Sequence, residues 1–300
     1  MSTNSTVVNH AITVFSAKLH ERAQQLKSRL RPYVDVMPLK GKQYAYDGIG
    51  TVEAREVNGR YSPVIFDEIE HFRRRIRTRE FAITLPIAES DIEERLQDPQ
   101  GYYINAIMAG MERRLDRLIV SEMFADVYTG ENMDTVLTYA NDGGVTLDCT
   151  AGLTYEKFLE GNENFIDNEV GNDGDVPFVM GLTGSEHTSC MTELELTSGD
   201  YSREYVVDKG TIQKAAGINL IKFAANGASA GADPILPVSA GVRTSFLMAK
   251  GAMVVGMTRE MKVAVEPRAD LHNTKQIKVT GRFGALRTEG KLIQKVTFTA

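Results

Sequence analysis

The chain has 300 residues, of which 42% are hydrophobic and 25% charged, and its formal net charge is −6. These proportions are typical of a globular protein and are ample for a sizeable core. The longest apolar stretch, residues 246–257, is interrupted by Lys250 and is shorter than the roughly 20 residues of a membrane span. With no apolar signal-peptide run at the N-terminus, we expect a cytoplasmic protein without a membrane segment.

The first 42 residues are basic, although the chain as a whole is acidic. They contain seven basic and two acidic side chains, against 27 basic and 38 acidic in the remainder. Apolar residues at helical spacing predict an amphipathic helix over 10–31, ended by Pro32. Its basic face predicts contact with an acidic surface or with nucleic acid, and a solvated face is the alternative. The candidates are Lys18, Arg22, Lys27, Arg29 and Arg31.

Residues 40–86 predict two long strands of an extended hairpin, because apolar and charged residues alternate over much of the segment. Its tip is expected near Asn58-Gly59 or at 68–70. An acidic group precedes a basic run. These charges have three possible roles: a solvated face, contact with nucleic acid, or charge pairing between subunits. Charge pairing best explains why both arms of the hairpin are charged. The candidates are Asp67, Glu68, Glu70, Arg73, Arg74, Arg75, Arg77 and Arg79.

The clearest predicted element is a helix that begins at Asp98-Pro99 and continues to about Tyr128, with apolar residues at i, i+3 and i+4 and charges on the other face. At 1.5 Å per residue it would be about 45 Å long. A turn-rich segment follows at 130–150. We expect helices capped by Thr154 and over 185–194, and strands over the ranges 176–180, 201–209, 217–223, 262–266, 274–280 and 291–299.

A search for catalytic or binding motifs favours none. Ser185 and His187 are near in sequence, but no nucleophile elbow surrounds them. The glycine-containing segments do not fit a phosphate-binding loop, and the segments 142–144 and 172–175 indicate turns rather than calcium loops. Cys149 and Cys190 lack metal-site spacing and are expected to be reduced and buried. We therefore expect no enzyme activity, no cofactor and no metal.

The order of these elements resembles the HK-97 type major capsid protein of tailed bacteriophages. The closing stretch strengthens the resemblance, with Arg268-Ala269-Asp270, then residues 274–277 and the segment Gly281-Arg282-Phe283-Gly284-Ala285-Leu286-Arg287. Similar endings, in which Gly-Ala-x-Arg lies between two strands, occur in phage capsid subunits. The resemblance implies an α+β HK-97-like capsid fold with an N-terminal arm (1–39), an E-loop hairpin (40–86), a P-domain with a long spine helix (87–151), an A-domain (152–260) and C-terminal strands that return to the P-domain (261–300).

The resemblance also implies a structural function. The chain would assemble into hexamers and pentamers of an icosahedral phage head that encloses double-stranded DNA, contacted non-specifically. The implied partners are further copies of the chain, a separate scaffolding protein, a portal protein and a decoration protein, with no membrane. Its location would be the virion, after assembly in the host cytoplasm. The alternatives are an encapsulin-like compartment, an α/β enzyme with an unrecognised site, and a tail-tube subunit, against which the long helix argues.

Overall fold

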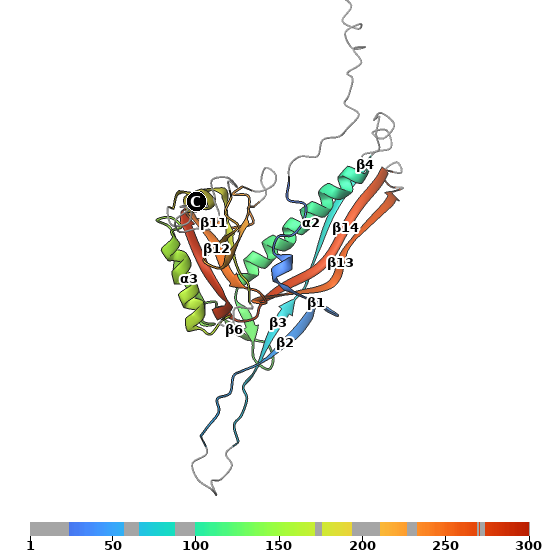
Figure 1. Ribbon diagram of the computed structural model, residues 1–300. Helices are drawn as coiled ribbons and strands as arrows, with labels where there is room; N and C mark the ends of the chain where they lie inside the picture. Colours follow the sequence, from blue (N-terminus) through green and yellow to red (C-terminus); the bar gives the residue numbers. More distant parts are fainter. Residues whose placement is uncertain are drawn as a thin grey trace, which may run out of the picture.

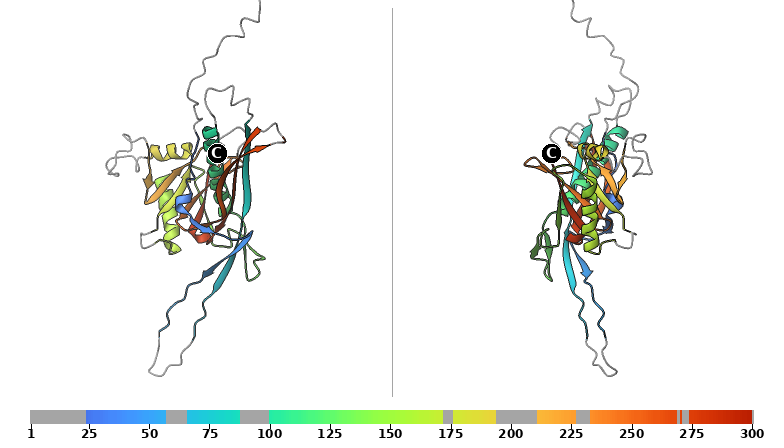
Figure 2. Two further views of the ribbon diagram at one scale, coloured as in Figure 1. Left: turned by 90° about the vertical axis from the view of Figure 1, so that its right-hand side faces the viewer. Right: turned by 60° about the vertical axis from the view of Figure 1, so that its left-hand side comes forward.

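The computed structural model describes residues 24–56, 66–87, 100–171, 176–193, 211–226, 233–268, 270 and 274–299. Within these ranges the chain forms three β-sheets and three α-helices. An elongated sheet with a long helix along it adjoins a second sheet, and a narrow hairpin projects away from both (Figures 1 and 2).

The elongated sheet has the strand order β1-β13-β14-β4, and α2 lies along one face of it (Figure 1). Alternate residues of β14, such as Ile277, Val279 and Phe283, are buried in one core with Met111 and Leu115 of α2, as expected of a sheet with one covered face. The bounds are β1 Asp35–Pro38, β13 Met253–Arg268, β14 Thr274–Arg287, β4 Arg79–Ile87 and α2 Gln100–Met123.

The second sheet has the order β7-β15-β12-β8-β10-β9, with β11 paired to β12. Its central strand β12 is buried on both faces: Phe246 and Met248 join the core of α2, whereas Leu247 packs with Phe158 and Phe165 of α3. The bounds are β7 Val145–Asp148, α3 Tyr155–Asp167, β8 Phe178–Leu182, α4 Gly184–Thr192, β9 Lys214–Ala215, β10 Ile218–Lys222, β11 Val238–Ser239, β12 Val242–Ala249 and β15 Ile293–Thr299.

The third sheet carries the hairpin and has the order β2-β3-β5-β6. β2 and β3 pair antiparallel over their whole length, and β5 meets β3 only at Thr129 and Arg74. Both views of Figure 2 show the two arms continuing beyond these strands and away from the body. The bounds are β2 Gln43–Ile49, β3 His71–Arg77, β5 Val127–Thr129 and β6 Thr135–Leu137.

Several predicted elements are confirmed. The long helix α2 occupies most of the expected range, although residues 88–99 lie outside the described ones. Helix α3 begins directly after Thr154, and α4 begins at a capping box formed by Thr183 and Glu186. Strands β8 and β10 lie at the expected places, whereas the strand expected over 201–209 falls outside the described residues.

The predicted N-terminal helix and the predicted end of α2 need correction. Residues 24–30 form no helix, and a 3-10 turn at Arg31–Tyr33 follows them; the rest of the predicted helix lies outside the described residues. Helix α2 ends at Met123 rather than near Tyr128. The buried guanidinium of Arg287 donates to the carbonyls of Met123 and Ala125 and so satisfies the helix end.

The predicted single strand over residues 72–85 is two strands in different sheets. The chain breaks at Thr78, whose N–H donates to Lys42 O, after which β4 pairs with β14. This crossing requires glycine at 284, because a Cβ there would lie 2.3 Å from Arg77 O. Residues 68–70 are not the hairpin tip, since Gly50 N donates to Glu70 O; Asn58-Gly59 lies outside the described residues.

The last three strands of the chain divide between two sheets, and the predicted return of residues 261–300 to the P-domain stays a prediction. β13 and β14 lie in the elongated sheet, but β15 pairs with β12 and β7 in the second sheet. Val296 and Phe298 of β15 are buried with the core of α3, and this burial explains the placement.

Candidate assembly interface

The hairpin register divides the arginine run between two faces. Arg73, Arg75 and Arg77 lie opposite Asp47, Ala45 and Gln43 of β2, and all three point to one face. Arg74 points to the other face and is buried. The basic run is therefore not a single contact surface.

The three outward arginines differ in their partners. Arg73 binds Asp47 through Nε at 2.6 Å and Nη2 at 3.3 Å, and this hydrogen bonding lowers the pKa of the Asp47 carboxyl. The guanidinium of Arg75 lies 3.9 Å from the ring centre of Tyr128. Arg77 is exposed and forms no ion pair with the residues that the structure describes. Arg77 is thus the most available of the three for a partner.

Arg79 lies beyond the strand break and belongs to a different surface. It is on β4, where its Nη2 lies 3.3 Å from Glu122 Oε1 of α2. Burial raises the pKa of Glu122, and the nearby Arg79 partly opposes that shift. Contact between Arg79 and a second subunit would therefore compete with the Arg79–Glu122 ion pair inside the chain.

Arg74 anchors the root of the hairpin to the body. Its Nη1 and Nη2 donate to the two carboxylate oxygens of Asp142, at 2.8 and 2.7 Å. Asp142 also accepts from Nε of Arg287 at 2.9 Å. All three side chains are at least nine-tenths buried, so one carboxylate compensates two guanidinium groups in the interior.

The same cluster contacts the elongated sheet and the second sheet. Arg287 is at the end of β14, and its guanidinium lies 5.3 Å from the ring centre of Tyr139. The Tyr139 hydroxyl lies 2.8 Å from both Ile293 O and Val145 O, donates its single proton to one of these carbonyls, and accepts from Lys295 N. Burial raises the pKa of Tyr139 to about 12, so the phenol stays neutral. We call Arg74, Asp142, Arg287 and Tyr139 the hairpin anchor.

The distal arms of the hairpin combine exposed apolar and acidic side chains. Phe66 is 88% exposed, and Val52 and Ile69 are about half exposed. Asp67 pairs with Arg55 at 2.6 Å, while Glu68 and Glu70 are exposed. An apolar surface this open on a narrow projection is typical of a surface that a partner covers.

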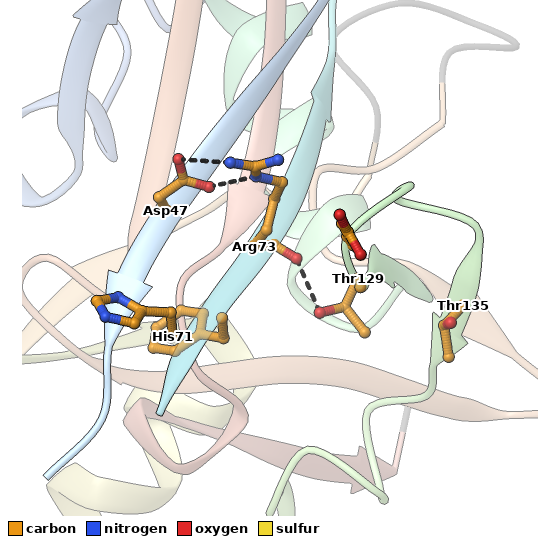
Figure 3. Close-up of a pocket in the computed structure, with 8 residues that line it drawn as sticks. Asp47, His71, Arg73, Thr129 and Thr135 are labelled. Atoms are coloured by element: carbon orange, nitrogen blue, oxygen red, sulfur yellow. Dashed lines mark hydrogen bonds and ion pairs between the residues drawn. The ribbon is translucent and has the colours of Figure 1, made fainter. Parts of the chain in front are cut away.

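A polar pocket lies at the hairpin root, between the hairpin and the turn that joins β5 to β6 (Figure 3). Its lining includes the Asp47–Arg73 pair, His71, Thr129 and Thr135, and Thr129 Oγ1 donates to Arg73 O at 2.8 Å. Asp47 and Arg73 neutralise each other, and Glu131 adds one further carboxylate to the lining.

Three of the predicted N-terminal contact residues are described, and two of them have side-chain partners within the chain. Lys27 is exposed, Arg29 lies 5.9 Å from the ring centre of Phe223, and Arg31 Nη2 is 3.6 Å from Glu260. Lys18 and Arg22 lie outside the described residues.

The groups considered for chemistry do not combine into a site among the described residues. Ser185 Oγ contacts Thr183 Oγ1, whereas His187 Nε2 accepts from Ile212 N. Cys149 and Cys190 are free and buried as predicted, and burial raises the pKa of each thiol to about 12. The described part of the chain holds no group of metal-ligating side chains, and none of its helices is long and apolar enough to cross a membrane.

Three buried charged residues were missed by sequence reasoning. Residues 142–144 were interpreted as a turn and the charges of the long helix as its other face, yet Asp142 is more than nine-tenths buried and Asp116 is fully buried. Arg287 was noted only as the end of a familiar motif. A charge beside buried apolar residues, as in Leu115-Asp116 and Leu286-Arg287, is the signal that could have identified them.

Comparison with known proteins identifies the family. Residues 7–300 match a family model described as phage capsid protein. The chain belongs to the phage capsid protein family. No curated protein matches it.

Solved phage capsids share its fold over nearly the whole chain. The capsid of cyanophage P-SCSP1u has a TM-score of 0.72 at 12% identity, over 98% of this chain and 94% of the other. The head structure of Helicobacter pylori bacteriophage KHP40 gives 0.72 at 10%, over 99% of each chain. The mature capsid of bacteriophage PhiM1 gives 0.69 at 12%, over 95% and 91%. The predicted HK-97-like α+β fold is confirmed.

Proposed function

We propose that this capsid protein is the major shell subunit, that it forms hexamers and pentamers enclosing double-stranded DNA, and that its role is structural rather than enzymatic. The supporting observation is the hairpin, whose distal arms expose Phe66, Val52 and Ile69 beside several carboxylates. An isolated subunit leaves this surface uncovered, whereas a closed shell supplies a neighbour for every hairpin.

The contact surface we propose is smaller than the whole charged run. It contains the exposed or half-exposed members Arg73, Arg75, Arg77, Asp67, Glu68 and Glu70 and the apolar residues of the distal arms. Arg74 is excluded because its guanidinium is bound inside the chain. For the N-terminal arm we propose Lys18, Arg22, Lys27, Arg29 and Arg31 as contact residues.

The partition proposed for the subunit follows the sheets. The N-terminal arm covers 1–39 and the E-loop about 40–77. The P-domain contains the elongated sheet with α2, and the A-domain contains the second sheet, including β15. A separate scaffolding protein, a portal protein and a decoration protein are the proposed partners, the packaged DNA is contacted non-specifically, and assembly takes place in the host cytoplasm.

Negative-stain electron microscopy of the expressed chain, alone and with a candidate scaffolding protein, tests this proposal. Closed shells, or sheets of hexamers and pentamers, are expected in at least one sample. A uniform small oligomer in both would contradict it. Shells that contain a protein cargo and no nucleic acid would instead favour an encapsulin-like compartment.

A further inference from the structure

One buried carboxylate on α2 holds the chain that enters the fold from the N-terminus. Asp116 is fully buried and accepts four hydrogen bonds, all from residues 25–30. The donors are Gln25 Nε2 at 2.5 Å, the Ser28 hydroxyl, Arg29 N at 3.0 Å and Leu30 N at 3.3 Å. Each carboxylate oxygen therefore accepts from one side chain and one backbone amide.

Two neighbours on the same side of the helix extend this attachment. Glu112 Oε2 accepts from Ser28 N at 3.3 Å, and Arg113 Nη1 donates to Gln24 Oε1 and Gln25 O, each at 3.0 Å. Positions 112 and 116 are one helical turn apart and 113 adjoins them. We call Glu112, Arg113 and Asp116 the clasp.

The clasp determines the path of a segment that has no regular structure of its own. Residues 24–30 form neither helix nor strand, so no ladder of backbone hydrogen bonds fixes their direction. Asp116 forms no ion pair with any residue described here, and its charge is held by oriented N–H and O–H groups. Such bonds depend on angle as well as distance, so they fix orientation.

Packing reinforces the clasp on its far side. Leu30 and Val34 are buried in the same core as Ile119 of α2, and the Arg29 guanidinium lies 5.9 Å from the ring centre of Phe223, which directly follows β10 of the second sheet. Residues 24–30 are thus held where α2 meets the second sheet.

We propose that Asp116 is a positioning residue for shell assembly: it fixes residues 24–30 on α2 and so fixes the point from which residues 1–23 leave each subunit. This inference rests on the proposed function. A closed shell repeats the same contacts many times, so arms that left their subunits along different paths could not all meet equivalent neighbours.

The main test substitutes Asp116→Asn in the full chain, with Asp126→Asn as the matched control at an exposed aspartate just after α2. An amide offers one acceptor oxygen in place of two, so some of the four donors lose their partner. We expect hydrogen exchange at the Arg29 and Leu30 amides of unassembled subunits to become about tenfold faster. Electron microscopy should then show irregular or open shells, while the control forms shells like the unmodified chain.

A second pair of variants approaches the clasp from the arm and leaves α2 unchanged. Ser28→Ala removes the hydroxyl that Asp116 accepts, whereas Ser28→Thr keeps it. We expect irregular shells from the alanine variant and regular shells from the threonine variant. The free alanine subunit should melt at a slightly lower temperature, because a buried acceptor loses a donor, and should still be folded at the temperature of assembly. Regular shells from both Ser28→Ala and Asp116→Asn would overturn the inference. Failure of the unmodified chain to assemble would count against the proposed function instead.

Discussion

The hairpin anchor makes a ranked stability prediction for two substitutions. Asp142→Ala removes the carboxylate that pairs with both Arg74 and Arg287, and within the described residues it leaves two buried guanidinium groups without a counter-charge. Removing one partner of a buried ion pair costs about 3–5 kcal/mol, and we expect the upper part of that range. Arg74→Met removes two hydrogen bonds to Asp142 but leaves the bond from Arg287 Nε. Its expected cost is lower, about 2–3 kcal/mol, since methionine preserves much of the packing volume.

Urea unfolding of the unassembled subunit, followed by circular dichroism, measures both costs. The expected order is that Asp142→Ala unfolds at the lowest urea concentration, Arg74→Met at an intermediate one and the unmodified chain at the highest. Asp142→Asn serves as a third variant, because it keeps the side-chain volume and one acceptor oxygen. The urea concentration at which it unfolds should lie between those of Asp142→Ala and Arg74→Met. If Asp142→Ala proves no less stable than Arg74→Met, the carboxylate is not the centre of the anchor.

Three further predictions concern the surface and the core. Reversal of Arg75 and Arg77 to glutamate should leave the subunit folded by circular dichroism but prevent shells, because like charges would face the partner; normal shells would remove these residues from the interface. Phe66→Ser should leave the melting temperature unchanged, because the ring is almost fully exposed, and should reduce shell yield in microscopy; an unchanged yield would show that the ring has no partner. Burial raises the pKa of Cys149 and Cys190 to about 12, so at pH 8 iodoacetamide should alkylate neither thiol in the native subunit and both in urea, as measured by mass spectrometry. Alkylation without urea would contradict their burial.

Local sequence patterns correctly predicted those helices and strands whose apolar spacing lies within a single element. The i, i+3 and i+4 spacing of α2 and the Thr154 start of α3 were visible because each helix buries a single apolar face. The overall order of elements then sufficed for the resemblance to phage capsids.

Long-range pairing could not be predicted from the same patterns. The alternation over residues 72–85 is as regular as that of one strand, and only the crossing over Gly284 shows why it must break at Thr78. The arginine run was correctly placed on a strand, but the burial of Arg74 depends on Asp142, 68 positions away. Likewise, the apolar residues of β15 predict a buried strand, but its pairing with β12 and its burial against α3 depend on residues far away in the sequence.

The most direct test of the account is a reconstruction of assembled shells by electron cryomicroscopy at a resolution that shows side chains. We predict that the distal hairpin arms lie on an adjacent subunit, with Phe66, Val52 and Ile69 covered by it and Arg74 still bound to Asp142. Shells in which the hairpin projects into solvent, with these three side chains uncovered, would contradict the proposal that the hairpin joins neighbouring subunits.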